Sequence, residues 1–195
     1  MSEFSEKNKK VPDKLRYRNL FLAGCGVGNR VAMLPLNKDE VDITMLKQFT
    51  DTLLNINLNP SQITPVMEVK KVLESDHGKI DSKRKMYLIE DFLKTMNKIP
   101  DYVQQVSEPQ ENDWFQFGHY MYDIVTTIIF GNKDCTEVEG KLNTIKQISQ
   151  KILDDSDLQN KVDEFIDNIR NKKSSIKIMN NCNDIANKVS EYLLT

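Results

Sequence analysis

His119 and Asp123 are the two residues whose types and spacing are best suited to acid–base chemistry. They lie four residues apart, so a helix places them on one face. A carboxylate can orient an imidazole so that it acts as a general base near neutral pH. No nucleophile or third group is spaced to join them, and a polar stripe on a helix accounts for them equally well. An enzyme that uses His119 and Asp123 is therefore an alternative hypothesis, and we assign no catalytic residue.

Metal ligands are scarce in this chain. A structural zinc site takes three or four Cys or His ligands. The chain has two histidines and three cysteines, and no two cysteines form a C-x-x-C pair: His77, His119, Cys25, Cys135 and Cys182. A sparse, odd set of cysteines is typical of reduced thiols, although a Cys135–Cys182 disulfide stays open. We predict no metal site and no cofactor.

Three of the seven glycines cluster at Gly24, Gly26 and Gly28. The cluster superficially resembles a dinucleotide-binding loop, but such a loop needs G-x-G-x-x-G between a strand and a helix. Here the third glycine comes one residue early, and Pro35 would cut short a following helix. We therefore expect a loop or tight turn at the glycines, with a short strand as one option for residues 17–23.

Charge and hydropathy argue against two classes of partner. The net charge of −2 gives no field that would hold a phosphate backbone, so no nucleic acid is expected. The basic triplet Lys83-Arg84-Lys85 is predicted to be a solvated helix face. No apolar stretch reaches the roughly 18 residues of a membrane span. The mixed charges of residues 1–10 suit no targeting peptide, so we expect an intracellular protein of the cytosol or an organelle matrix, not a secreted one.

Helical periodicity between residues 41 and 96 is accompanied by loop residues at a regular spacing. Ile43 and Ile80 are 37 residues apart, Gly78 lies two residues before the second Ile, and Asn59-Pro60 separates two helices between them. This segment resembles the calmodulin-like EF-hand pair, in which each calcium loop carries a Gly followed by an Ile. The resemblance covers about 55 residues, under a third of the chain.

The calcium ligands of that family are missing. An EF-hand loop needs oxygen ligands at positions 1, 3 and 5 and a Glu at position 12. In the second loop Leu73 and Arg84 stand at positions 1 and 12, and in the first loop Leu36 and Lys47 do. The resemblance therefore implies a pair that binds no calcium and keeps the groove in which such pairs clasp an amphipathic helix.

The residues that this resemblance implies for partner binding are Met45, Phe49, Met86, Ile89 and Met96. Methionine suits such a role because its unbranched, polarisable side chain adapts to varied shapes. The alternative is that these side chains form the core of the helical domain.

The second half of the chain begins after a predicted helix end at Pro100 and a polar linker over residues 101–111. An aromatic helix is then expected from Asn112 to Gly131, with polar residues confined to one narrow stripe. A helix of this kind is central in a bundle or binds a partner, so Trp114 and Tyr120 join the predicted partner-binding residues. Three amphipathic helices follow, with N-terminal signals at Thr136-x-x-Glu139, at Ser156-x-x-Gln159 and at Ser175.

These patterns predict an all-α helical bundle, with an EF-hand-like helical hairpin followed by C-terminal antiparallel helices. The predicted divisions are an arm and glycine-rich turn over 1–35, a helical domain over 36–100 and a C-terminal bundle over 112–195. The predicted function is a non-catalytic protein-binding or structural subunit of a larger complex, acting through helical surfaces. The alternatives are the enzyme above and a carrier of a lipid or small ligand, with the aromatic helix as a pocket wall.

Overall fold

The computed structural model describes residues 13–30, 43–75, 82–129, 131 and 135–194, and the fold it shows is an all-helical bundle. The predicted fold class is therefore confirmed. The helices are α1 Asp13–Gly28, α2 Ile43–Asn55, η1 Pro60–Gln62, α3 Thr64–Ser75, α4 Ser82–Val106, α5 Pro109–Ile129, η2 Cys135–Glu137, α6 Glu139–Ile152, α7 Ser156–Arg170 and α8 Ser175–Tyr192. Along these stretches, no helix is long and apolar enough to cross a membrane.

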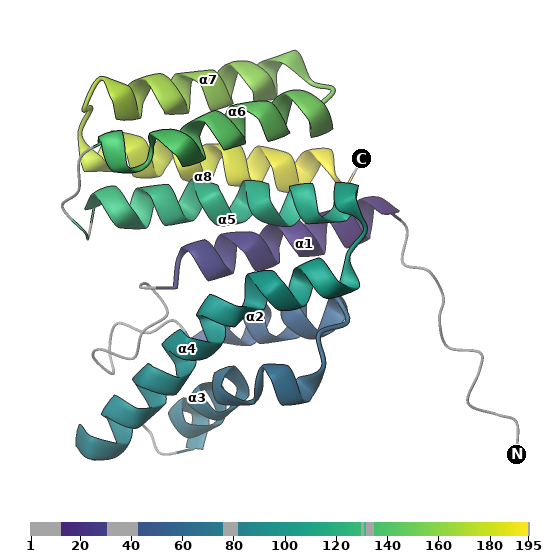
Figure 1. The fold of residues 1–195 in the computed structure, drawn as a ribbon, viewed down its shortest axis with the longest axis vertical. Helices are drawn as coiled ribbons and strands as arrows, with labels where there is room; N and C mark the ends of the chain where they lie inside the picture. The colour runs from purple at the N-terminus through teal and green to yellow at the C-terminus, as the bar shows by residue number, and fades with distance from the viewer. Residues whose placement is uncertain (1–12, 31–42, 76–81, 130, 132–134, 195) are drawn as a thin grey trace, which may run out of the picture.

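The helices form an upper bundle and a lower hairpin layer. In Figure 1 the upper bundle holds α1, α5, α6, α7 and α8 with their axes nearly parallel, and the lower layer holds α2, α3 and α4. Helix α1 packs on α5 above it and on α2 below it, and α4 connects the lower layer to the start of α5. One continuous cluster of buried apolar side chains runs through both parts. The N-terminal helix is thus a central element of the fold.

The turn expected at Gly24, Gly26 and Gly28 and the optional strand over residues 17–23 are both wrong, because residues 13–28 form helix α1. Glycine has a low helix propensity, so a cluster of glycines normally indicates a turn. Here Gly24 and Gly28 lie one helical turn apart against the backbone of α5, and Gly118 of α5 lies against the backbone of α1. A Cβ atom on Gly24 would overlap the carbonyl oxygen of Phe115, and one on Gly118 would overlap that of Phe21. We call Gly24, Gly28 and Gly118 the glycine seam.

The seam lets two helix backbones touch, in the way that small residues four apart do at close helix crossings. The gain in packing outweighs the helix propensity that the glycines give up. Residues 24–28 cannot form a phosphate-binding loop, because their backbone is helical rather than open. A side-chain hydrogen bond adds to the contact, since Thr126 of α5 donates from Oγ1 to the carbonyl of Gly28 at 3.1 Å.

The expected helix end at Pro100 is also wrong, because α4 continues to Val106 and the predicted linker is mostly helical. Proline removes one helical hydrogen bond, but Ile99 and Val103 on either side of it are fully buried. Arg16 of α1 secures the junction that follows: its Nη2 donates to the carbonyl of Val106 at 3.1 Å and to Glu111 Oε2 at 3.2 Å. The burial of Ile99 and Val103 and the hydrogen bonds of Arg16 therefore stabilise the helix on both sides of Pro100.

The last three helices exist as predicted, but their N-caps differ by one residue or more. Helix α6 starts after Val138, which makes no side-chain cap, so the predicted box at Thr136 is absent. Asp155 rather than Ser156 caps α7, accepting from the backbone of Asp157 and Leu158 at 2.8 and 3.0 Å. Ser174 rather than Ser175 caps α8. A cap needs a non-helical backbone, and Asp155 has one while Ser156 is already helical.

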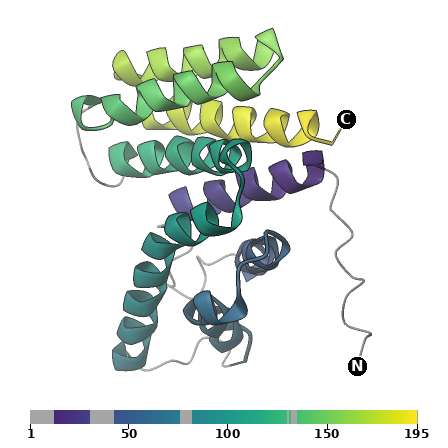
Figure 2. The same cartoon turned by 45° about the vertical axis from the view of Figure 1, so that its right-hand side comes forward.

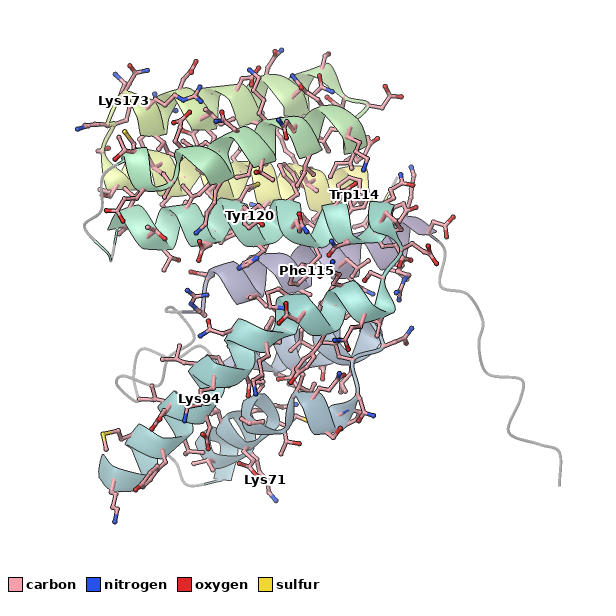
Figure 3. All side chains as sticks on the ribbon, viewed as in Figure 1. Lys71, Lys94, Trp114, Phe115, Tyr120 and Lys173 are labelled. Carbon is pink, nitrogen blue, oxygen red and sulfur yellow. The ribbon has the colours of Figure 1, made fainter. Side chains whose placement is uncertain are left out.

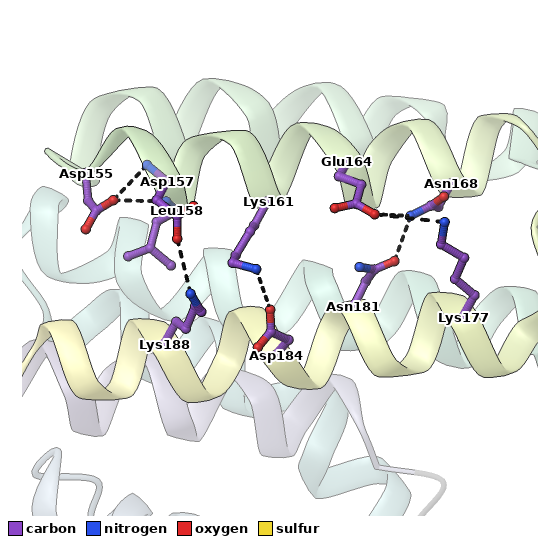
Figure 4. A network of polar contacts seen from close by, with 10 residues as sticks. All are labelled: Asp155, Asp157, Leu158, Lys161, Glu164, Asn168, Lys177, Asn181, Asp184 and Lys188. Atoms are coloured by element: carbon purple, nitrogen blue, oxygen red, sulfur yellow. Dashed lines mark hydrogen bonds and ion pairs between the residues drawn. The ribbon is translucent and has the colours of Figure 1, made fainter.

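A line of polar contacts ties α7 to α8, as Figure 4 shows. Lys161 Nζ lies 2.8 Å from Asp184 Oδ2, and Lys188 Nζ lies 3.1 Å from Asp157 Oδ2. Toward the C-terminal end of α7, Asn168 Nδ2 donates to Asn181 Oδ1 of α8 at 2.7 Å. These contacts fix the register of two helices whose inner faces are apolar.

Candidate functional site

Asp123 is a buried ion-pair partner in the structure. Its side chain is 8% exposed, and it pairs with Lys141 of α6 and with Arg30 at 3.5 Å, just beyond the end of α1. Among the described residues both of its ion-pair partners are cations from other elements, and neither is His119. The carboxylate therefore joins three elements of the bundle, which is a structural use of a buried charge.

His119 lies one turn before Asp123, between two aromatic rings. Its ring centroid is 5.8 Å from that of Phe115 and 5.4 Å from that of Tyr120. Burial lowers the pKa of His119 to about 4; the nearby carboxylate of Asp123 opposes this, and the charges of Arg30 and Lys141 add to it. The imidazole is therefore neutral at pH 7 and packed against rings, which gives it a role in packing.

The three cysteines carry free thiols, so Cys135 and Cys182 form no disulfide. Burial raises the pKa of the Cys25 thiol well above its usual range, and burial likewise raises the pKa of Cys182. Thiols of raised pKa are poor nucleophiles. A cavity of about 220 Å³ next to Cys25 lies between α1, α2 and Tyr122 of α5. In the described parts of the chain, no cluster of three or more His, Cys, Asp or Glu could hold a metal ion.

Residues 36–42 and 76–81, which hold parts of both loops of the EF-hand resemblance and include Gly78 and Ile80, lie outside the described residues. Ile43 is the first residue of α2. The resemblance stays a prediction.

The predicted partner-binding residues fall into two groups. Phe49, Met96 and Trp114 are buried in the core, at 5%, 0% and 3% exposed. Met86 is 62% exposed, whereas Ile89 and Tyr120 are half-buried. Met45 belongs to α2, but its side chain is outside the described part. Figure 3 shows Trp114 and Tyr120 on α5, within the upper bundle. Of this set, Met86 is the residue most open to a partner.

The larger apolar depression lies elsewhere, on the outer side of α2 and α3. It is a solvent-open groove of about 490 Å³. We call it the α2–α3 groove; its lining residues are Thr50, Asp51, Leu54, Pro60, Ser61, Thr64, Met67, Glu68, Lys70 and Lys71. Most of the lining surface is apolar, and its volume falls in the range of roughly 300–1,000 Å³ at which pockets bind ligands.

Local sequence explains why the groove forms. Val66 and Val69 of α3 are buried, so the opposite face, with Met67 and Lys71, points outward. Asn59 holds the turn between α2 and α3: its side chain accepts from the backbone of Ser61, and its backbone donates to Gln62. This turn holds Pro60 at one end of the groove.

Charged side chains of both signs surround the groove. Lys70 Nζ lies 4.0 Å from Asp51 Oδ1, so an ion pair joins the two helices. Glu68 and Lys71 are exposed, and Figure 3 shows Lys71 pointing away from the molecule at its lower end. An apolar floor with a mixed-charge rim is the usual anatomy of a protein-binding surface.

Sequence reasoning missed this site. Met67 and Leu54 were available as a signal, since each is a large apolar residue on the outer side of its helix. The EF-hand resemblance favoured other residues instead: Met45, Phe49, Met86, Ile89 and Met96.

No protein-family model matches the chain, no curated protein matches its sequence, and no solved structure matches its fold.

Proposed function

We propose that this chain is a non-catalytic protein-binding subunit of a larger complex and that the α2–α3 groove is its main binding surface. The observation that carries the proposal is the groove itself, where Pro60 and Met67 are exposed and Leu54 is half-buried between two helices. The Met67 side chain is 37% exposed, so a partner that covers it removes apolar surface from water, which is favourable.

The groups that could do chemistry support a non-catalytic role because each is used in packing. Asp123 joins α5 to Lys141 and Arg30, and His119 is neutral between two rings. The aromatic rings of α5 give the carrier alternative little support, since Trp114, Phe115 and Phe117 are buried in the core. The three free thiols favour an intracellular location, in the cytosol or an organelle matrix.

The shape of the groove favours a helical segment as the bound element. An open groove between two helices accepts the apolar stripe of a third helix, with anchors spaced at one helical turn. Rim charges of both signs favour a protein, because a lipid brings a single charged end whereas a helix can bring both signs.

Site-specific photocrosslinking in cells of the source tests the proposal. A photoreactive phenylalanine replaces Met67 in the groove, and in a second variant it replaces Ile176, which is 75% exposed on α8. The proposal predicts a discrete crosslinked protein from position 67 and none of that mass from position 176. No crosslink from position 67, or the same products from both positions, would contradict it.

A further inference from the structure

We propose that a partner of the α2–α3 groove is a second copy of this chain, which inserts the Met86–Tyr87 turn of its own α4. The inference rests on the proposed function, since it names the partner of the same surface. It follows from one property of the molecule: the lower layer exposes both an apolar groove and an apolar helical turn.

The inserted element is the first part of α4. Met86 and Tyr87 are 62% and 54% exposed, among the most exposed large apolar side chains that the structure describes. Figures 1 and 2 show that this part of α4 extends away from the upper bundle to the lower end of the molecule. A projecting helix with two large exposed apolar side chains is the kind of segment that a groove between helices accepts.

The receiving element is the apolar part of the groove lining, Leu54, Pro60 and Met67. Its volume of about 490 Å³ has room for a few large side chains. Met67 is unbranched and flexible, so it can adjust to an aromatic ring and can place its sulfur beside one. A Tyr also suits a half-open site, since its ring is apolar and its hydroxyl can stay in water.

Charges on the two elements are complementary. In the sequence, three basic residues, 83–85, precede Met86, and Glu90 and Asp91 stand three and four residues after Tyr87; Glu90 already pairs with Lys94 at 2.7 Å. The groove rim offers Asp51 and Glu68 to basic side chains and Lys71 to Asp91. The ion pair between Asp51 and Lys70 is long, at 4.0 Å, and the Asp51 side chain is 55% exposed, so this carboxylate can accept a further cation.

The turn and the groove are different surfaces of one molecule. A reciprocal exchange, in which each copy gives one turn and receives one, closes a two-fold dimer, the commonest symmetry among oligomers. Each contact is then a groove of one copy filled by the turn of the other.

Sedimentation velocity and native mass spectrometry on the full-length protein test the inference. We expect a species of twice the 22.6 kDa monomer mass at micromolar concentration. Met67→Lys and Met86→Lys should each weaken self-association at least about tenfold, which is about 1.4 kcal/mol. Ile176→Lys is the matched control, because it replaces an exposed apolar residue on α8 and should leave the dimer unchanged.

Mixing the two variants gives the sharper result. Met67→Lys keeps an intact turn and Met86→Lys keeps an intact groove, so an equimolar mixture should form a heterodimer through one contact while each variant alone stays monomeric. Circular dichroism checks that each variant folds, and Tyr87→Gln provides a second turn variant if Met86→Lys does not.

Three results would overturn the inference: a monomer throughout the concentration range, a dimer indifferent to both substitutions, or no heterodimer on mixing. If the protein is monomeric while position 67 crosslinks to a different protein, the second-copy inference fails and the proposed function stands. If position 67 crosslinks to nothing and the protein is monomeric, both fail.

Discussion

The α1–α5 contact and the α2–α3 pair are two helix contacts of opposite construction. At the first, Gly24, Gly28 and Gly118 bring two backbones together, and no space is left for even one added carbon. At the second, the helices bury one face each and leave a groove between their outer sides, with Met67 on its floor. The first contact has a single close arrangement, whereas the second can accept a further side chain. The close α1–α5 contact should therefore contribute mainly to stability, whereas we propose that the lower layer serves binding.

The largest effect should come from adding one methyl group to the glycine seam. Gly24→Ala places a carbon against the backbone of Phe115, which cannot move as a side chain can. We expect a loss of about 3 kcal/mol or more in the free energy of unfolding, measured by urea denaturation.

Gly140→Ala is the matched control for that substitution. Gly140 lies in α6, and an added Cβ meets nothing within 4 Å. Alanine has the better helix propensity, so we expect a gain of about 0.5–1 kcal/mol. Equal effects of Gly24→Ala and Gly140→Ala would contradict the close contact between α1 and α5.

The next largest effect should follow the loss of the Asp123 carboxylate. Asp123→Asn leaves Lys141 and Arg30 without their shared partner, and we expect a cost of about 2 kcal/mol, less than for a fully buried pair because both cations are partly exposed. Asp163→Asn, at a half-exposed ion pair with Lys146, should change stability by less than about 0.5 kcal/mol. If Asp123→Asn lowered the free energy of unfolding less than Asp163→Asn, the proposal that Asp123 stabilises the upper bundle would be contradicted.

Acid should destabilise the upper bundle through His119. Its pKa is about 4 in the folded protein and about 6.5 when unfolded, so between these values the unfolded state binds a proton that the folded state does not. The free energy of unfolding should therefore fall as the pH is lowered from about 6.5 to about 4. We expect the wild type to lose about 2 kcal/mol more than His119→Gln over this window. Parallel pH profiles of the two proteins would show that His119 is not held neutral.

The smallest effect on stability should come from the groove. Met67→Lys replaces an exposed side chain on α3 with another good helix former, so its free energy of unfolding should stay within about 0.5 kcal/mol of the wild type. Its effect on binding should be large by comparison. A large loss of stability would mean that Met67 belongs to the core and would weaken the contrast between the two regions.

The sequence predicted the helices better than their contacts. Apolar residues at helical spacing were enough for an all-α fold and for the helices that became α2, α3 and α6 to α8, since burial of one face decides a helix. Gly24 and Gly28 were misinterpreted because the glycines are needed for a close contact with the backbone of α5, which is distant in the sequence. Pro100 misled for a similar reason, since the burial of Val103 and the hydrogen bond from Arg16 are tertiary contacts.

The binding surface was the least predictable part. Met86 is exposed, whereas Phe49 and Met96, which have the same pattern in the sequence, are buried. Periodicity identifies an apolar face without saying whether another helix of the chain covers it. That Leu54 and Met67 line one groove follows only from the packing of α2 against α3, which periodicity does not predict.

The native mass of the untagged protein in a gentle extract of its source tests the central claim most directly. A protein that binds through this groove should run at twice 22.6 kDa or more, and the Met67→Lys protein should run at a lower mass than the wild type. A wild-type protein that runs alone near 22.6 kDa, or an assembly that Met67→Lys leaves unchanged, would contradict a binding role for the α2–α3 groove.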